Sequence, residues 1–188
     1  DTLLLDKTGT ITLGDRRATE FAPCQQVPRD KVRDAAFLTS LEDPTPEGRS
    51  IVALATEQGV DMQLSEEADG ATFEAFSAET RLSGVDLTSG KKIRKGAPNA
   101  IAEWVRAQGG DIPSDYNQVI ERISRDGATP IAVAENQQIL GVVALSDVIK
   151  SGIAEKFAEL RAMGIKTVMI TGDNPITASA IAATAGVD

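Results

Sequence analysis

Hydrophobic residues follow two kinds of pattern along the chain. Near each end lies a short apolar run without polar alternation, Leu3–Leu5 and Val168–Ile170. Such runs are typical of fully buried parallel strands. Between them, short segments of alternating apolar and polar residues are separated by Gly, Asp and Ser turns, which indicates an antiparallel sheet. The pattern therefore predicts an α/β part whose sequence is interrupted by an α+β part.

The periodicity also gives the expected ranges of the elements. Strands are expected at residues 17–26, 71–76, 82–87, 92–95, 129–135 and 138–145. Helices are expected at residues 29–42, 46–58, 98–108, 115–125 and 175–185, the last opened by a proline. Residues 135–138 read as a hairpin turn.

Two polar segments divide the chain into domains. Gly14-Asp15 and Lys150–Gly152 have the flexible, polar composition of hinges between bodies that approach and separate. We therefore expect residues 1–14 and 151–188 to form one domain and residues 15–150 to form a second domain inserted into it.

A carboxylate stands at the end of the first apolar run. Asp6 follows Leu3–Leu5, and ligands of open α/β sheets bind beyond the carboxyl ends of the strands. The small residues Thr8–Thr10 can surround phosphate oxygens, with Gly9 free to take positive φ. A carboxylate can form an aspartyl-phosphate, with Lys7 and a magnesium ion offsetting the charge. Asp6 is thus a candidate nucleophile, and a capping aspartate at a strand end is the alternative.

The second apolar run also ends in a polar loop. Thr171-Gly172-Asp173 precedes the helix that Pro175 opens, and helix N-termini bind anions. This arrangement also caps ordinary helices. Beside Asp6, however, it predicts a second wall of a phosphate site.

The segment Asp6–Thr10 resembles the phosphorylation signature of the P-type ATPases, members of the haloacid dehalogenase superfamily. The resemblance implies an α/β fold: a partial Rossmann-like phosphorylation domain of the haloacid dehalogenase type, interrupted by an α+β nucleotide-binding domain with an antiparallel sheet flanked by helices. It implies ATP and Mg²⁺ as cofactors, the metal being held by Asp6 and the Thr8 carbonyl. It also places Thr171 near the phosphoryl oxygens and Asp173 near the nucleotide or magnesium.

Thr8 marks a difference from the hydrolases of that superfamily. These enzymes usually carry a second aspartate two residues after the nucleophile, where it serves as acid and base. A nucleotide diphosphate leaves with little protonation, so Thr8 permits phosphorylation of Asp6 but provides no local base for hydrolysis. We therefore expect a long-lived phosphoenzyme.

A basic strand supplies the first candidates for a nucleotide pocket. Alternation puts Ile93 and Lys95 on one face, so Lys95 is expected in a pocket, with Gly96 allowing close approach of a base. Lys91, Lys92 and Arg94 are instead expected to form a solvated basic edge.

Phe76 lies beside a polar loop in a chain with only 4% aromatic residues, which favours a role in stacking on adenine over a place in the core. Ser83 and Gly84 offer a small surface. Arg81 could face phosphate or pair with Glu79.

Glu47 reads as a residue of a first helical turn, where the helix dipole favours a carboxylate. Pro44–Ser50, Phe76–Gly84 and Arg94–Ala97 together resemble the nucleotide-binding domain of potassium-importing P-type ATPases. That resemblance implies an adenosine pocket lined by residues including Glu47, Phe76, Ser83, Lys95 and Gly96. Asn99 departs from it, because an acidic residue is expected there.

Composition limits the remaining possibilities. The chain has 188 residues, 41% of them hydrophobic, and no apolar run long enough to span a membrane. One cysteine, Cys24, and no histidine argue against a disulfide or a zinc site. The net charge of -9 argues against nucleic acid as a partner and implies that ATP needs a local basic cluster.

The resemblance also implies what lies outside this sequence. The sequence contains no actuator motif, no membrane helices and no second magnesium-binding aspartate motif. We therefore expect a soluble fragment of a pump at the cytoplasmic face of a bacterial or archaeal membrane. The expected partners are the rest of the parent chain and the channel-like and accessory subunits of a potassium pump. The alternatives are a heavy-metal-like cation ATPase, a phosphatase with a large cap and a non-catalytic nucleotide-binding module.

Overall fold

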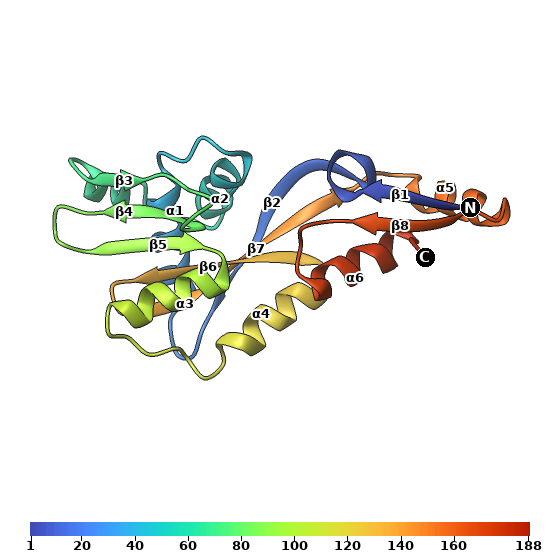
Figure 1. Cartoon of the computed structure of the whole chain (residues 1–188). Helices are drawn as coiled ribbons and strands as arrows, with labels where there is room; N and C mark the ends of the chain where they lie inside the picture. Colours follow the sequence, from blue (N-terminus) through green and yellow to red (C-terminus); the bar gives the residue numbers. More distant parts are fainter.

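The computed structural model describes residues 1–188 and shows an elongated molecule with two lobes (Figure 1). The strands are β1 (Thr2–Asp6), β2 (Thr12–Pro23), β3 (Thr72–Glu74), β4 (Leu82–Asp86), β5 (Lys92–Gly96), β6 (Ala128–Glu135), β7 (Gln138–Ile149) and β8 (Lys166–Ile170). The α-helices are α1 (Arg29–Ser40), α2 (Pro46–Glu57), α3 (Pro98–Ala107), α4 (Tyr116–Arg125), α5 (Ile153–Ala162) and α6 (Pro175–Ala185). Short helical turns cover Lys7–Ile11 and Met62–Ala68.

The large lobe is built on an antiparallel sheet of six strands in the order β2-β7-β6-β5-β4-β3. Helices α1 and α2 pack on one face of this sheet around a core of 17 buried residues, which includes Phe37, Ile51 and Val143. Helices α3 and α4 pack on the other face around 14 buried residues, which include Ile101 and Ile123. The predicted antiparallel sheet flanked by helices is confirmed.

Strands β2 and β7 connect the two lobes. They pair continuously from Pro23 opposite Gly141 to Thr12 opposite Ile149, with register irregularities at two points. Both strands are longer than the alternation predicted, and the expected hinge at Gly14-Asp15 lies within β2. The polar residues there contribute nothing to a core, so the hydrophobic pattern could not mark them as strand. The division into 1–14, 15–150 and 151–188 stays a prediction.

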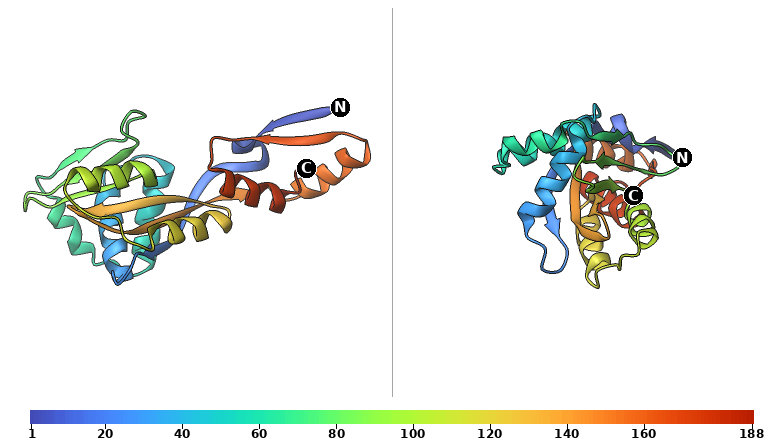
Figure 2. Two further views of the ribbon diagram at one scale, coloured as in Figure 1. Left: turned by 60° about the horizontal axis from the view of Figure 1, so that its bottom comes forward. Right: turned by 90° about the vertical axis from the view of Figure 1, so that its left-hand side faces the viewer.

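The small lobe holds both termini and a two-stranded parallel sheet, β1 beside β8 (Figure 2). The parallel pairing is as predicted, but the expected full burial of Leu3–Leu5 is wrong: Leu3 is 39% and Leu4 61% exposed. Leu5 and Met169 pack toward Phe157 of α5, whereas the side chains of the opposite face have no cover. Two strands with helices on one side bury only one face.

No helix of the chain combines the length and the apolar character needed to cross a membrane.

Amide hydrogen exchange should distinguish the two lobes. Only three fully buried apolar residues form the core of the small lobe, against 17 and 14 in the large one. Exchange at Leu3–Leu5 should therefore be faster than at β6 and β7 by about two orders of magnitude or more, since local openings of poorly packed segments cost little free energy. Equal protection of the two sets of strands would contradict this account of the packing.

Candidate functional site

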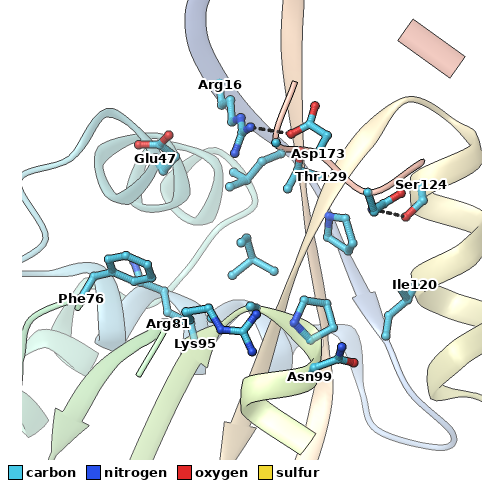
Figure 3. A pocket seen from close by; sticks show the side chains of 18 of the residues that line it. Arg16, Glu47, Phe76, Arg81, Lys95, Asn99, Ile120, Ser124, Thr129 and Asp173 are labelled. Carbon is cyan, nitrogen blue, oxygen red and sulfur yellow. Dashed lines mark hydrogen bonds and ion pairs between the residues drawn. The ribbon is translucent and has the colours of Figure 1, made fainter. Parts of the chain in front are cut away.

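One cavity of about 1270 Å³ lies between the lobes. The candidate residues that line it are Asp6, Thr8, Thr171 and Asp173 from the small lobe and Glu47, Phe76, Arg81, Ser83, Lys95 and Gly96 from the large one. Figure 3 shows Phe76 and Lys95 on one side of this space and Asp173 on the other. Segments far apart in the sequence therefore meet in one site. Of the other candidates, Lys7, Gly9, Thr10 and Gly84 do not line it.

The phosphate end of the cavity is formed where β1 and β8 end. Asp6 is paired with Ile170 across the parallel sheet, so the loops that follow the two strands lie together. Gly9 has φ +79°, the left-handed conformation that the loop was predicted to need. Thr171 Oγ1 accepts a hydrogen bond from the Asp173 amide at 3.1 Å. The Asn174 side chain caps α6 by accepting a bond from the Thr177 amide at 2.8 Å.

Four charged side chains form a closed cluster behind this end of the cavity, which we call the charge ring: Lys7, Arg16, Asp147 and Asp173. The Lys7 ammonium donates to both aspartates, at 2.6 Å to Asp173. Arg16 Nη2 lies 2.9 Å from Asp173 Oδ1, and its Nε lies 3.7 Å from Asp147 Oδ1. Because Arg16 is on β2 and Asp147 on β7, the ring ties the connecting strands to the two loops of the small lobe.

Lys7 is part of the charge ring. Its side chain is fully buried and donates to Asp147 and Asp173. Asp173 does line the cavity, but its carboxylate already accepts hydrogen bonds from Lys7 and Arg16. Because charges also act through space, the expected role of Lys7 in offsetting charge at Asp6 stays a prediction.

The nucleotide end of the cavity is formed by β4, β5 and the start of α2. Ser83 and Lys95 are direct cross-strand partners. Phe76 lies beyond the end of β3 and is 62% exposed, so the core does not use its ring. Glu47 lies in the first turn of α2, as predicted.

Gly96 also has a packing role. A Cβ at this position would lie 2.4 Å from the Arg81 carbonyl oxygen and 2.8 Å from Leu82 Cα. The missing side chain therefore makes room for the neighbouring strand β4, and the close approach of a base to Gly96, which lines the cavity, stays a prediction.

Lys95 is a buried pocket lysine. Its ammonium donates to Asp43 Oδ2 at 2.6 Å and to Ser40 Oγ at 2.9 Å. Burial lowers the pKa of Lys95, and this effect outweighs the hydrogen bond and charge of Asp43 and the charge of Glu47, which raise it. The lysine therefore loses its proton more easily than a lysine in water.

The expected solvated edge is wrong for Arg94. Strand β5 lies between β4 and β6, so it is not an edge, and Arg94 is buried. Its guanidinium pairs with Glu74 at 3.0 Å and Asp86 at 2.8 Å and lies 5.4 Å from the centre of the Trp104 ring. Lys92 is exposed, as predicted.

Arg81 lines the cavity and has no ion pair with Glu79 or with any other carboxylate of the chain. Its φ of +56° is unusual for a residue with a side chain. The structure lacks the ion pair with Glu79, and a role of Arg81 toward phosphate stays a prediction.

Comparison with known proteins agrees with this geometry. The family model of haloacid dehalogenase-like hydrolases matches residues 1–188. The chain belongs to this family.

Curated relatives match the chain over its whole length. The "Potassium-transporting ATPase ATP-binding subunit" of Xanthomonas campestris pv. campestris is 62% identical and that of Deinococcus radiodurans 56%, each over 100% of this chain. The chain spans 27% of the length of these curated relatives. A solved structure of a zinc-transporting PIB-type ATPase superposes with a TM-score of 0.64 at 25% identity, over 100% of this chain and 28% of its own.

Three charged residues that the structure places at the site were not singled out from the sequence: Arg16, Asp43 and Asp147. Asp147 follows the apolar segment of β7 just as Asp6 follows that of β1, which is a signal that the sequence did contain. Arg16 and Asp43 lie in polar stretches, where nothing distinguishes them from solvated charges.

The charge ring makes a prediction about stability. Asp147→Asn removes one charge from a cluster whose Lys7 and Asp147 side chains are only 1% and 2% exposed. Leaving a buried cation without this partner should lower the free energy of unfolding of the small lobe by about 3 kcal/mol. Hydrogen exchange of Thr167–Met169 measures this effect.

Asp126→Asn is the matched control, since this aspartate is 69% exposed and lies 3.8 Å from Arg122. We expect a change within about 0.5 kcal/mol. Equal effects of the two substitutions would show that the charge ring has no special part in stability.

Proposed function

We propose that this chain is the ATP-binding, aspartyl-phosphorylated catalytic portion of a P-type cation pump that drives potassium import. The observation that carries the proposal is the shared cavity: Phe76 and Lys95 line it together with Asp6. A nucleotide whose base lies at Phe76 would extend its phosphates toward the carboxylate. The likeness of the chain to potassium-transporting ATPase subunits supports potassium as the ion.

The reaction is phosphoryl transfer by positioning. A carboxylate oxygen of Asp6 attacks the γ-phosphorus in line, the bond to the bridging oxygen breaks, and ADP leaves with that oxygen. Thr171 donates its hydroxyl hydrogen to the phosphoryl oxygens, and Arg81 faces the nucleotide phosphates. Thr8 cannot act as a base, so hydrolysis of the aspartyl-phosphate depends on parts of the parent protein outside this chain.

The residues present can hold magnesium only in part. The chain contains no cluster of three or more carboxylate, histidine or cysteine side chains suited to a metal. The Asp6 carboxylate and the Thr8 carbonyl are hard oxygen ligands of the kind that Mg²⁺ prefers, and this ion commonly keeps water and phosphate oxygens as further ligands. When bound, the ion would offset charge on the γ-phosphate.

The remaining proposals concern the parent protein. Its other segments would provide the membrane and actuator domains, and channel-like and accessory subunits would complete a potassium pump. This portion would lie at the cytoplasmic face of the membrane. Each of these proposals rests on the relatives, of which the chain covers 27%.

Phosphorylation of the parent ATPase tests the role of Asp6. Incubation with γ-labelled ATP should give a protein-bound label that is stable in acid and released by hydroxylamine, as expected for an acyl phosphate. Asp6→Asn should abolish this label, because the amide is not a nucleophile. Asp15→Asn, at an exposed position nearby, should retain it. A label that persists in Asp6→Asn would refute the assignment.

Titration of the chain with ATP tests the pocket. Phe76→Ala should weaken binding about tenfold, because base stacking on an aromatic ring contributes roughly 1 to 3 kcal/mol. Lys95→Ala should weaken it to a similar degree. Met62→Ala, which removes an equally exposed apolar side chain outside the cavity, is the control. Unchanged affinity in both pocket variants would exclude this pocket.

A further inference from the structure

Two residues outside the predicted set accept hydrogen bonds from the Lys95 ammonium: Ser40, and Asp43, which also lines the cavity. Lysine has three N–H donors. Two of them are used, by Asp43 Oδ2 at 2.6 Å and by Ser40 Oγ at 2.9 Å. Ser40 in turn donates to the Ala36 carbonyl of α1 at 2.8 Å, so its oxygen is fixed. One donor of Lys95 is therefore left for a ligand in the cavity that Lys95 lines.

Asp43 is itself held on both sides. Its Oδ1 accepts from the Thr45 amide at 3.0 Å and from Thr45 Oγ1 at 2.7 Å, while Thr45 Oγ1 accepts from the Gly48 amide at 3.0 Å and caps α2. The same carboxylate thus joins the end of α1, the start of α2 with Glu47, and β5.

The first turn of α2 packs tightly against this carboxylate. A Cβ on Gly48 would lie 2.3 Å from Asp43 Cγ, much closer than two carbon atoms can approach. Gly48 has an ordinary helical conformation, so the glycine is required here by space and not by φ. The Asp43 carboxylate therefore packs directly against the backbone of this turn.

We propose that Asp43 is a positioning residue of the nucleotide pocket, which keeps the Lys95 ammonium charged and aims its remaining N–H at the nucleotide. This inference rests on the proposed ATP site and adds to it a residue that does not itself bind the ligand. A carboxylate beside a site for an anionic ligand would otherwise weaken binding, so its presence needs this compensating role.

The ionisation of the pair agrees with this role. Burial raises the pKa of the Asp43 carboxyl, but hydrogen bonds from Lys95 and Thr45 and the charge of Lys95 outweigh it, and the net pKa lies below its ordinary value. Burial lowers the pKa of Lys95, and Asp43 provides the largest effect that raises it. The other charged groups near Lys95 are Glu47 of α2, which also raises its pKa, and Arg81, which lines the same cavity.

The charge state of Lys95 determines how nucleotide binding should change with pH. A lysine whose pKa is lowered loses its proton at a lower pH than it does in water, and its charged contact with the nucleotide is lost as the pH rises through that value. Asp43→Asn removes the main effect that counters burial, so Lys95 should lose its proton at a lower pH in this variant than in the parent chain.

Two measurements on the 188-residue chain test the proposal. In Asp43→Asn, the midpoint of the Lys95 side-chain titration, followed by NMR without nucleotide, should fall by about one pH unit. The affinity for ATP should fall by up to about tenfold, with the larger loss at the alkaline side of the Lys95 titration and the smaller loss at the acidic side. In a Lys95→Met background, Asp43→Asn should cause no further loss, because the two residues act as a pair. Glu42→Gln, which neutralises an exposed neighbouring carboxylate, should bind ATP like the parent.

Gly48→Ala provides a second route if Asp43→Asn folds poorly. It keeps every charge and adds a good helix former outside the cavity lining, but its methyl group would displace the Asp43 carboxylate. It should reproduce the weaker, more pH-sensitive binding of ATP.

An unchanged Lys95 titration in Asp43→Asn, or an equal loss of affinity with and without Lys95, would overturn the proposal while leaving the ATP site intact. A parent chain that binds no ATP would overturn the proposed function and this inference together.

Discussion

The pairing of β2 with β7 is the constraint on which the rest of the structure depends. These two strands belong to the large sheet, where both of its faces are covered, and they continue beyond it to the small lobe. They carry Arg16 and Asp147 to the place where β1 and β8 end. There the charge ring fixes the two phosphate-end loops to the strands that come from the nucleotide pocket. The cavity between the lobes is a consequence of this connection.

This arrangement explains how a weakly packed lobe can still present an ordered site. The apolar core of the small lobe is slight, and Leu4 on its sheet is 61% exposed. Ionic contacts supply what apolar burial does not: Lys7 is fully buried between two carboxylates, and Asp188 holds the start of β8 by accepting from Thr167. Hydrogen bonds from Thr167 and Arg161 lower the pKa of Asp188 to about 2, so this carboxylate stays charged at neutral pH.

Much of the fold was predictable, and the exceptions have physical reasons. Helix α2 was placed within one residue because its periodic apolar positions report burial directly, and α6 was placed because Pro175 opens it and an Ala-rich stretch follows. Helix α5 buries only Phe157, so its sequence holds little periodic signal and it was not placed. The exposed face of β1 could not be foreseen either. An apolar run indicates that a strand prefers to be buried, but it does not show whether other segments of the chain cover both faces of that strand.

The site residues that could be predicted are likewise those with a local signal in the sequence. Asp6, Phe76 and Lys95 were found because each contrasts with its surroundings: a carboxylate after an apolar run, an aromatic residue beside a polar loop, and a lysine on an apolar face. Arg94 was misjudged because its partners Glu74 and Asp86 lie on other strands, and pairing between strands is not visible in a local pattern. Asp43 and Arg16 depend in the same way on long-range contacts.

The central claim is that one nucleotide occupies both ends of the cavity. A map of amide chemical-shift changes, recorded while the labelled chain is titrated with a non-hydrolysable ATP analogue and Mg²⁺, tests it most directly. Residues at Phe76 and Lys95 and residues at Thr8 and Gly172 should shift together, with one dissociation constant. Shifts confined to one end, or to the small hollow near Arg125 and Ser179, would contradict it.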